Sequence, residues 1–209
     1  MSTQPNAGPE DFDLRGWRPR IVPNELAVDS AAAEQAAADL LTALGLDLNN
    51  PNIAETPRRM AQALIEMTSP PAFELTTFPN DEGYDELVVV QDIPVHSLCE
   101  HHMLPFHGVA HVGYLSGDRI LGLSKFARMV DFHSRQPQTQ ERLTKQIAEH
   151  LNTALGAKGV GVVIEAEHMC MSERGAKAPG ARTTTSTLLG RLREDHQTRT
   201  EFLSLLRKH

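Results

Sequence analysis

The spacing of hydrophobic residues indicates two helices near the start of this chain. Residues 29–46 are rich in alanine with an apolar stripe, and residues 52–67 repeat apolar side chains every three to four positions, a spacing typical of amphipathic helices. Asp29 or Ser30 is placed to cap the first helix, and Thr56, which precedes a proline, to cap the second. The chain is therefore expected to open with a helical segment.

After residue 80 the pattern changes to apolar runs rich in β-branched residues, interrupted by two further helical patterns. Strands are predicted in residues 85–98, 108–123, 159–171 and 182–192. Helices are predicted in residues 124–135, 138–156 and 194–208. The order of two helices, two strands, two helices, two strands and a helix predicts one α+β domain behind the helical segment.

The first residues of the chain show no hydrophobic period. They contain proline, glycine, asparagine and charges of both signs, a composition that favours a flexible arm. We therefore divide the chain into a flexible arm at 1–27, an N-terminal helical segment at 28–70 and a main domain at 71–209.

The overall composition is that of a soluble globular protein, with 40% hydrophobic and 22% charged residues among 209. A formal net charge of −7 argues against binding to nucleic acid or to an anionic membrane surface. No apolar run approaches the roughly 18 residues of a membrane span, and no apolar segment typical of a secretory signal is visible. We expect a cytoplasmic protein whose two cysteines are thiols, metal ligands or catalytic groups rather than a disulfide framework.

Both cysteines have histidines close by in the sequence. Cys99 and His102 form a C-x-x-H pair with His101 between them, and Cys170 follows His168 by two positions. Thiolate and imidazole are good zinc ligands. The alternative is that both cysteines are buried thiols and the histidines are near them by chance. Because both cysteines have a histidine within three residues, this is the weaker interpretation.

Cys99, His102 and Cys170 supply three ligands, and the pattern leaves the kind of metal site open. Two cysteines and one histidine with a free fourth position are typical of a catalytic zinc site, in which spare histidines serve as general acids or bases. If His101 or His168 is instead the fourth ligand, the site is structural.

Positive charge is concentrated at the start of the helix predicted at 124–135. Ser124, Lys125 and Arg128 lie there, and the two cations share one face. A hydroxyl, an ammonium and a guanidinium at a helix N-terminus form a good anion site, although ordinary surface cations at a solvated helix start give the same pattern. Arg174, four residues after the second cysteine, would extend such a site toward the metal.

Gln140 and Glu141 open the helix predicted at 138–156. A glutamate in the first turn commonly does no more than complement the helix dipole. A buried carboxylate there would suit a ring with adjacent N–H donors, such as the Watson–Crick edge of guanine. Both interpretations are open on these residues alone.

In combination, these motifs resemble the GTP cyclohydrolase I family. The segments SLCEHHMLPFHGVAHVGY, GLSKFARMV, RQPQTQERLTKQI, GVGVVIEAEHMCM and TTTSTLLG occur in the family's order and spacing, from about Thr56 to Leu206. The resemblance implies a tunnelling fold, in which antiparallel sheets of several subunits close a barrel with helices outside, and a homodecamer of two pentamers with active sites between subunits. The implied reaction converts GTP and water to 7,8-dihydroneopterin triphosphate and formate, the first step of folate and pterin biosynthesis.

The resemblance also implies a role for each matching residue. Cys99, His102 and Cys170 match the zinc ligands, and His101 and His168 match the catalytic histidines. Substrate contacts are implied for Arg59 (lent by a neighbouring subunit), Ser124, Lys125, Arg128 and Arg174 at the triphosphate, and for Gln140 and Glu141 at the guanine.

Two other functions are compatible with much of this pattern. A relative dedicated to a secondary pterin-like or deazapurine pathway would use the same site. A non-catalytic zinc-binding assembly protein would not need His101, His168 and Glu141, which argues against it. The sequence departs from the family at Glu173 and in the loop 178–181, which bears on triphosphate binding rather than on the metal ligands.

Overall fold

The computed structural model describes residues 27–206, so the arm predicted at 1–27 lies almost wholly outside the described residues. Helices within this range are Ser30–Ala43 (α1), Thr56–Thr68 (α2), Ser124–Ser134 (α3), Gln140–Leu155 (α4), Met169–Ser172 (α5), Arg191–Glu194 (α6) and His196–Leu205 (α7). Strands are Thr77–Pro79 (β1), Leu87–Cys99 (β2), Pro105–Leu115 (β3), Arg119–Leu121 (β4), Pro137–Gln138 (β5), Gly159–His168 (β6) and Arg182–Gly190 (β7). No helix in this range is long and apolar enough to cross a membrane.

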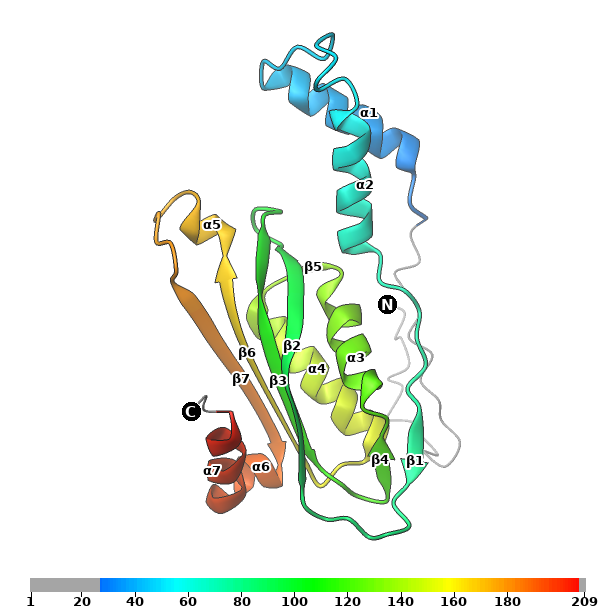
Figure 1. Ribbon diagram of the computed structural model, residues 1–209, viewed down its shortest axis with the longest axis vertical. Coiled ribbons are helices and arrows are strands. Elements are labelled where there is room, and N and C mark those ends of the chain that lie inside the picture. Colours follow the sequence, from blue (N-terminus) through cyan, green and yellow to red (C-terminus); the bar gives the residue numbers. More distant parts are fainter. Residues whose placement is uncertain (1–26, 207–209) are drawn as a thin grey trace, which may run out of the picture.

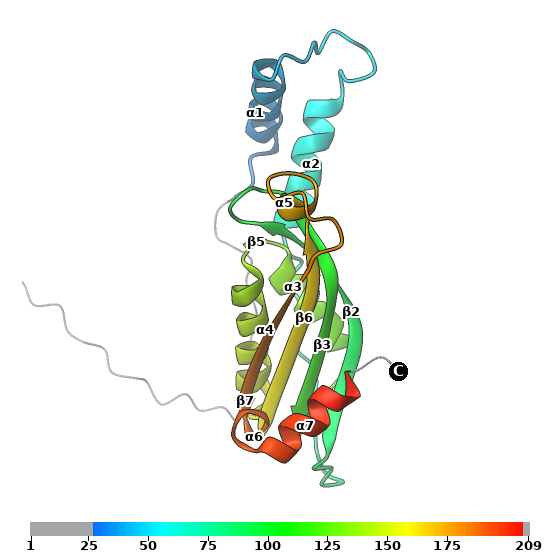
Figure 2. The same ribbon diagram turned by 90° about the vertical axis from the view of Figure 1, so that its left-hand side faces the viewer.

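A curved five-stranded sheet forms the centre of the chain (Figure 2). Its strand order is β5-β2-β3-β6-β7, antiparallel throughout except for the short parallel pairing of β5 with β2. The register of β2 shifts between Val90 and Ile93, where Asp92 has φ 53°. Such a bulge bends a strand and increases its twist, which accords with the curvature.

Helices α3 and α4 cover one face of this sheet (Figures 1 and 2). In α4, the side chains of Leu143, Ile147, Leu151 and Leu155 recur every four residues and are all buried, so one helix face lies against the sheet. The helix begins at a capping threonine and ends at Gly156, which has a left-handed conformation. This packing fixes where the first turn of α4 meets the sheet.

The opposite face of the sheet is covered at one end by α7. Phe202 packs there over Gly113 and Gly161, where an added Cβ would lie 2.8 Å and 2.7 Å from its ring. The two glycines are register partners on β3 and β6. They make room for the phenylalanine, which is fully buried.

Helices α1 and α2 pack on each other and project beyond one end of the sheet (Figure 1). Ala37, Leu41 and Ala61 are buried between them, whereas Leu40 and Leu44 are exposed. Both helices predicted in this part of the sequence are therefore present.

The observed elements differ from the predicted ones in a few places. Asp29 caps α1, as expected, and accepts from the Ala32 amide at 2.9 Å. Thr56 was expected to cap α2 but is its first residue, with Glu55 as the cap. Residues 169–171 were expected in a strand and form part of α5, because β6 ends at His168.

Residues 191 and 192, expected at the end of a strand, belong to the short helix α6, and the last predicted helix corresponds to α7. The two helices meet at Asp195. This carboxylate accepts from the Thr198 amide at 2.9 Å and so begins a new helix. Strands β1 and β5 were not predicted; they have three and two residues and each contains a proline. Runs this short carry no readable hydrophobic alternation.

Candidate metal centre and active site

Cys99, His102 and Cys170 come together at one end of the sheet. Cys99 is the last residue of β2, His102 lies in the turn that follows, and Cys170 lies in α5, directly after β6. Because β2 and β6 both run antiparallel to β3, their last residues meet at the same end. The two sulfurs and an imidazole nitrogen all lie within 4.8 Å of one another.

The turn between β2 and β3 places two histidines over Cys99. The Cys99 amide donates to the Leu104 carbonyl and the Met103 amide to the Cys99 carbonyl, each at 2.8 Å. Met103 has φ 52°, a left-handed residue that lets the chain reverse within a few positions. As a result, Nδ1 of His101 and Nδ1 of His102 each lie 3.9 Å from the Cys99 sulfur.

This donor set fits a zinc ion. With zinc–ligand bonds of about 2.0–2.3 Å in a tetrahedron, ligand atoms lie roughly 3.5 Å apart, close to the observed sulfur–nitrogen distance of 3.9 Å. Burial raises the pKa of the Cys170 thiol, and the neighbouring Cys99 raises it further, so two thiols stand side by side where a cation would favour their thiolates. Within residues 27–206, one cluster of histidine, cysteine or acidic side chains is close enough to hold a metal ion. It consists of these three residues and includes neither His101 nor His168.

His168 is held beside the group by a ring stack and a hydrogen bond. Its ring lies 4.5 Å from the ring of Phe106 at an angle of 12°, and its Nε2 lies 2.8 Å from Oε1 of Gln140. Burial lowers the pKa of His168, while the nearby Glu141 carboxylate acts in the opposite direction. The first turn of α4 therefore brings both Gln140 and Glu141 to this end of the sheet.

His101 is linked to α4 through Glu100. The Glu100 carboxylate lies 3.8 Å from Nε2 of His101 and also pairs with the Arg142 guanidinium. Arg142 is itself anchored to Gln138 Oε1 at 2.8 Å and to the Pro137 carbonyl. The side chain of His101 is 66% exposed, so this chain of contacts supports the ring from one side and leaves it open to solvent.

Sequence reasoning missed three residues at this site. Glu100 lies within the CEHH segment and Arg142 follows Glu141 directly, so their positions were a usable signal. Phe106 offered none beyond an apolar residue in a strand. It contacts His168 because β3 and β6 pair in a register that puts the two directly opposite.

The predicted anion-binding residues are divided between two places. Burial raises the pKa of the Cys170 thiol, and Arg174 lies close enough to this thiol for its charge to oppose that rise. Ser124 and Arg128 are exposed on α3, and Nζ of Lys125 donates to the Glu74 carbonyl at 2.8 Å. The start of α3 follows β4, toward the end of the sheet opposite α5 (Figure 1).

Arg59 is likewise apart from the metal ligands. It is exposed on α2, in the pair of helices that projects from the body of the chain (Figure 1). Within one chain, the structure thus brings Gln140, Glu141 and Arg174 to the metal ligands. It does not bring the α2 and α3 residues there.

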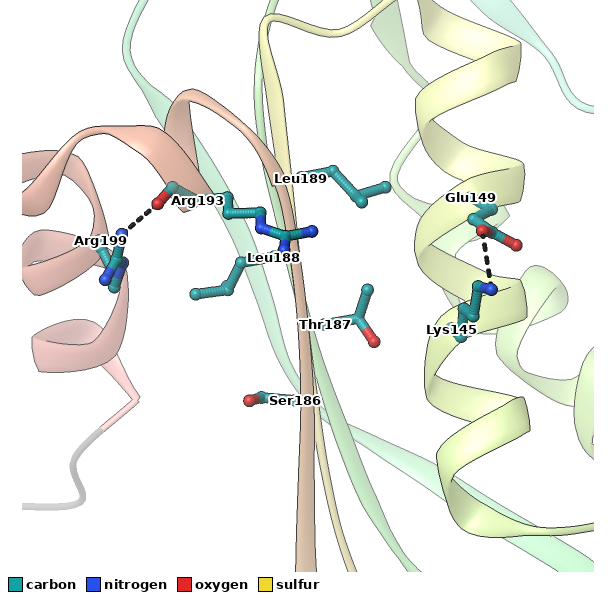
Figure 3. Close-up of a pocket in the computed structure, with 8 residues that line it drawn as sticks. All are labelled: Lys145, Glu149, Ser186, Thr187, Leu188, Leu189, Arg193 and Arg199. Atoms are coloured by element: carbon teal, nitrogen blue, oxygen red, sulfur yellow. Dashed lines mark hydrogen bonds and ion pairs between the residues drawn. The ribbon is translucent and has the colours of Figure 1, made fainter.

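A surface hollow of about 760 Å³ lies elsewhere, between α4 and the outer edge of β7 (Figure 3). The Lys145–Glu149 ion pair, at 3.6 Å, borders it on α4, and the Arg193 side chain lies near the strand. It is lined by Lys145, Glu149, Ser186, Thr187, Leu188, Leu189, Arg193 and Arg199. No predicted site residue is among them, so this hollow is separate from the metal centre.

A curled antiparallel sheet with helices packed on it, and two cysteines and a histidine that could hold a metal ion at its strand ends, define a protein of the tunnelling-fold class. The sequence matches the GTP cyclohydrolase I family over residues 33–207. The chain belongs to this family. The predicted family and fold class are therefore both confirmed.

Named relatives cover most of the chain. GTP cyclohydrolase 1 of Mycobacteroides abscessus is 50% identical over 185 residues, 85% of this chain and 90% of that protein. GTP cyclohydrolase 1 of Mycobacterium leprae is 46% identical over 198 residues, 91% of this chain and 96% of that protein. Among solved structures, the archaeosine synthase QueF-Like in the apo form is similar with a TM-score of 0.42 and 18% identity, over 50% of this chain and 93% of that one.

Proposed function

We propose that this chain opens the imidazole ring of GTP by hydrolysis, giving 7,8-dihydroneopterin triphosphate and formate, the first step of folate and pterin biosynthesis. The observation that carries the proposal is the convergence of Cys99, His102 and Cys170, with His101 and His168 beside them. The two relatives that are 50% and 46% identical to this chain are each a GTP cyclohydrolase 1, which supports the choice of GTP as substrate.

Cys99, His102 and Cys170 would hold one zinc ion. Two thiolates and an imidazole are a soft donor set that favours zinc over the harder divalent metals. Bound there, zinc would supply Lewis-acid activation of water for attack on C8 of the guanine.

His101 and His168 would carry the protons of the reaction. Imidazole titrates near neutral pH, so it can deliver a proton to the opening ring and take one back. Hydrolysis of the resulting formamide releases formate, and the ribose then opens, rearranges and recloses on the freed amine by proton transfers alone. His168 is fixed by Phe106 and Gln140, while His101 is exposed and backed by Glu100.

Glu141 would bind the base. It is exposed in the first turn of α4 and lies near His168, and a carboxylate can accept from the adjacent N–H donors of guanine. The amide hydrogens of Gln140 are already bonded within the chain, and its oxygen lies 2.8 Å from Nε2 of His168. Only the second lone pair of that oxygen is left for the base.

The triphosphate would lie between chains. Arg174 is near the metal ligands, but Ser124, Lys125 and Arg128 lie toward the far end of the sheet in the same chain, so a neighbouring copy has to supply them. Arg59, exposed on the projecting α2, would come from a neighbouring copy as well.

The sheet has two open edges that would join such copies. β5 pairs with β2 only at Leu98 and Cys99, and the outer edge of β7 has no strand partner within residues 27–206. Open edges template pairing with another chain, and edge-to-edge pairing of curved sheets would close a barrel. This supports the proposed homodecamer of two pentamers, working in the cytoplasm, where thiol ligands stay reduced.

The proposal is tested with full-length protein loaded with zinc and incubated with GTP. We expect formate and, after oxidation, a fluorescent pterin, both absent from metal-stripped protein and restored when zinc is returned. Consumption of GTP without formate by fully metallated oligomer would contradict the proposed reaction and favour a different product.

A further inference from the structure

We infer that Gln140 is a positioning residue that holds His168 as the tautomer with its proton on Nε2. The neutral ring then has its free lone pair on Nδ1. The tautomer follows from hydrogen bonds within the chain. Its consequence for turnover rests on the proposed function.

The carboxamide of Gln140 can be oriented in only one way. Its Nε2 lies 3.0 Å from the Ile164 carbonyl, 2.9 Å from the Thr183 carbonyl and 3.1 Å from Oγ1 of Thr185. Main-chain carbonyls only accept hydrogen bonds, so the amide group must face them. A flipped carboxamide would place its oxygen against two carbonyl oxygens. Gln140 is only 2% exposed, so water could not relieve this repulsion and the flipped orientation would be unfavourable.

The neighbouring hydroxyls fit the same direction. Oγ1 of Thr144 lies 2.7 Å from the main-chain carbonyl of Gln140 and donates its single hydrogen there. The Thr185 hydroxyl, 2.6 Å from Oγ1 of Thr144, then donates to it. The lone pairs of Thr185 are left to accept from the Gln140 amide, whose two hydrogens are shared among this hydroxyl and the two carbonyls.

The remaining atom of the carboxamide, Oε1, faces Nε2 of His168 at 2.8 Å. An amide oxygen only accepts, so Nε2 must carry a hydrogen. The stack on the fully buried Phe106 fixes the plane of the ring, and Gln140 fixes its orientation within that plane. In the neutral ring the free lone pair is therefore on Nδ1.

This role has a kinetic signature distinct from guanine binding. A carboxamide cannot give up or accept a proton at neutral pH, so Gln140 acts through His168. Its loss should lower kcat while the KM for GTP stays nearly constant. A residue that mainly binds the base would instead raise KM when it is lost.

The tautomer is measured directly by solid-state ¹⁵N NMR on metal-loaded protein labelled at its ten histidines. The His168 signals are those missing from the His168→Ala spectrum. We expect a protonated Nε2 and an unprotonated Nδ1 in the wild type. Protonation at Nδ1 with a bare Nε2 would overturn the inference, whether or not the protein turns over GTP.

The kinetic test compares Gln140→Met with Glu141→Gln. For Gln140→Met we expect kcat to fall about tenfold or more, KM to change by less than about threefold, and the two His168 tautomers to become mixed. Glu141→Gln should raise KM instead. A raised KM with unchanged kcat in Gln140→Met would overturn the inference in favour of direct base contact.

Thr185 gives a milder matched pair that does not depend on the folding of Gln140→Met. Thr185→Ser keeps the hydroxyl and should keep kcat, whereas Thr185→Val removes it and should lower kcat with little change in KM. Equal kcat in the two variants would count against the network. If the wild type lacks turnover, the proposed function fails, and the NMR result alone decides the tautomer.

Discussion

The proposed metal ligands lie close together because they lie at strand ends. Cys99 ends β2, and Cys170 follows β6 by two residues, so the pairing of both strands with β3 carries the two sulfurs to one place. His102 then needs only the tight turn after Cys99. The main chain that carries each proposed ligand is thus held by strand pairing and by turn hydrogen bonds within the chain, which limits the ordering that binding has to achieve.

Cys170→Ser should abolish metal retention. A serine hydroxyl stays protonated at neutral pH and is a far weaker zinc ligand than a thiolate. Metal content after dialysis, measured by mass spectrometry, should fall from one ion per chain to near zero. Met171→Ser, at an exposed neighbouring position, is the control and should keep its metal. A Cys170→Ser protein with full metal content would remove Cys170 from the ligand set.

His168→Ala should keep the metal and lose turnover. His168 is outside the ligand group and is bonded to Gln140, while general acid–base groups contribute roughly a hundredfold or more to rate. Formate release should fall by about that factor at unchanged metal content. His107→Ala, at an exposed position on β3, is the matched control. Wild-type turnover in His168→Ala would exclude His168 from proton transfer.

At the scale of elements, α4 links the core to the site. Its buried stripe packs against the sheet, and its first turn delivers Gln140, Glu141 and Arg142 to the metal end. A helix anchored along its whole length by apolar packing is a rigid support. The positions of both proposed catalytic histidines therefore depend on how α4 sits on the sheet.

Helices α3 and α4 are joined by a partly buried histidine pair. Nε2 of His133 lies 2.9 Å from Nδ1 of His150, and Nε2 of His150 is buried without a partner among the described residues. Burial, assisted by the neighbouring His150, lowers the pKa of His133 to about 4. Burial also lowers the pKa of His150. Both rings are therefore neutral in the folded state at pH 7.

The pair should make the fold sensitive to acid. The folded-state pKa of His133 is below its unfolded value of 6.5, so the unfolded chain binds more protons below that pH. The contribution of neutral His133 to the free energy of unfolding should be complete above pH 6.5. It should be lost as the pH falls toward 4, which lowers the free energy of unfolding by on the order of 2 kcal/mol. Denaturant unfolding of wild type and His133→Gln at several pH values checks this. An equally steep loss of stability in the variant would contradict it.

The elements could be predicted where the chain's own pattern decides them. The amphipathic stripe of α4 and its glycine end were readable, as was the cap at Asp29. The two-residue β5 was not, because it exists only through pairing with Leu98 and Cys99. Likewise, the conversion of residues 169–171 from strand to helix depends on where β6 stops pairing with β3.

For the site, spacing identified the chemistry and not the geometry. The C-x-x-H pair and the second cysteine predicted the group that the structure brings together. The contacts of His168 with Phe106 and Gln140 depend on strand register and helix placement, which local sequence does not encode. The separation of Lys125 from the metal ligands is likewise a consequence of topology.

At the scale of the whole molecule, the site should be shared between chains. Cys170→Ser removes the metal half, and Lys125→Met removes a cation of the triphosphate half. Each variant alone should be inactive. Co-expressed in equal amounts, they should regain about one quarter of wild-type formate release. With random mixing, the metal half of a site is intact in half of the sites, and the triphosphate half is intact in half of those. Activity no higher than that of the parent variants would place the whole site in one chain.

The central claim is that this chain, with metal bound, removes C8 of GTP as formate. The most direct measurement is ¹³C NMR of GTP labelled at C8, incubated with zinc-loaded and metal-stripped protein. We predict that the label moves from GTP to formate, one for one, only with metal, while the pterin product carries none. Label retained in a purine or in the pterin, or identical spectra with and without metal, would contradict the account.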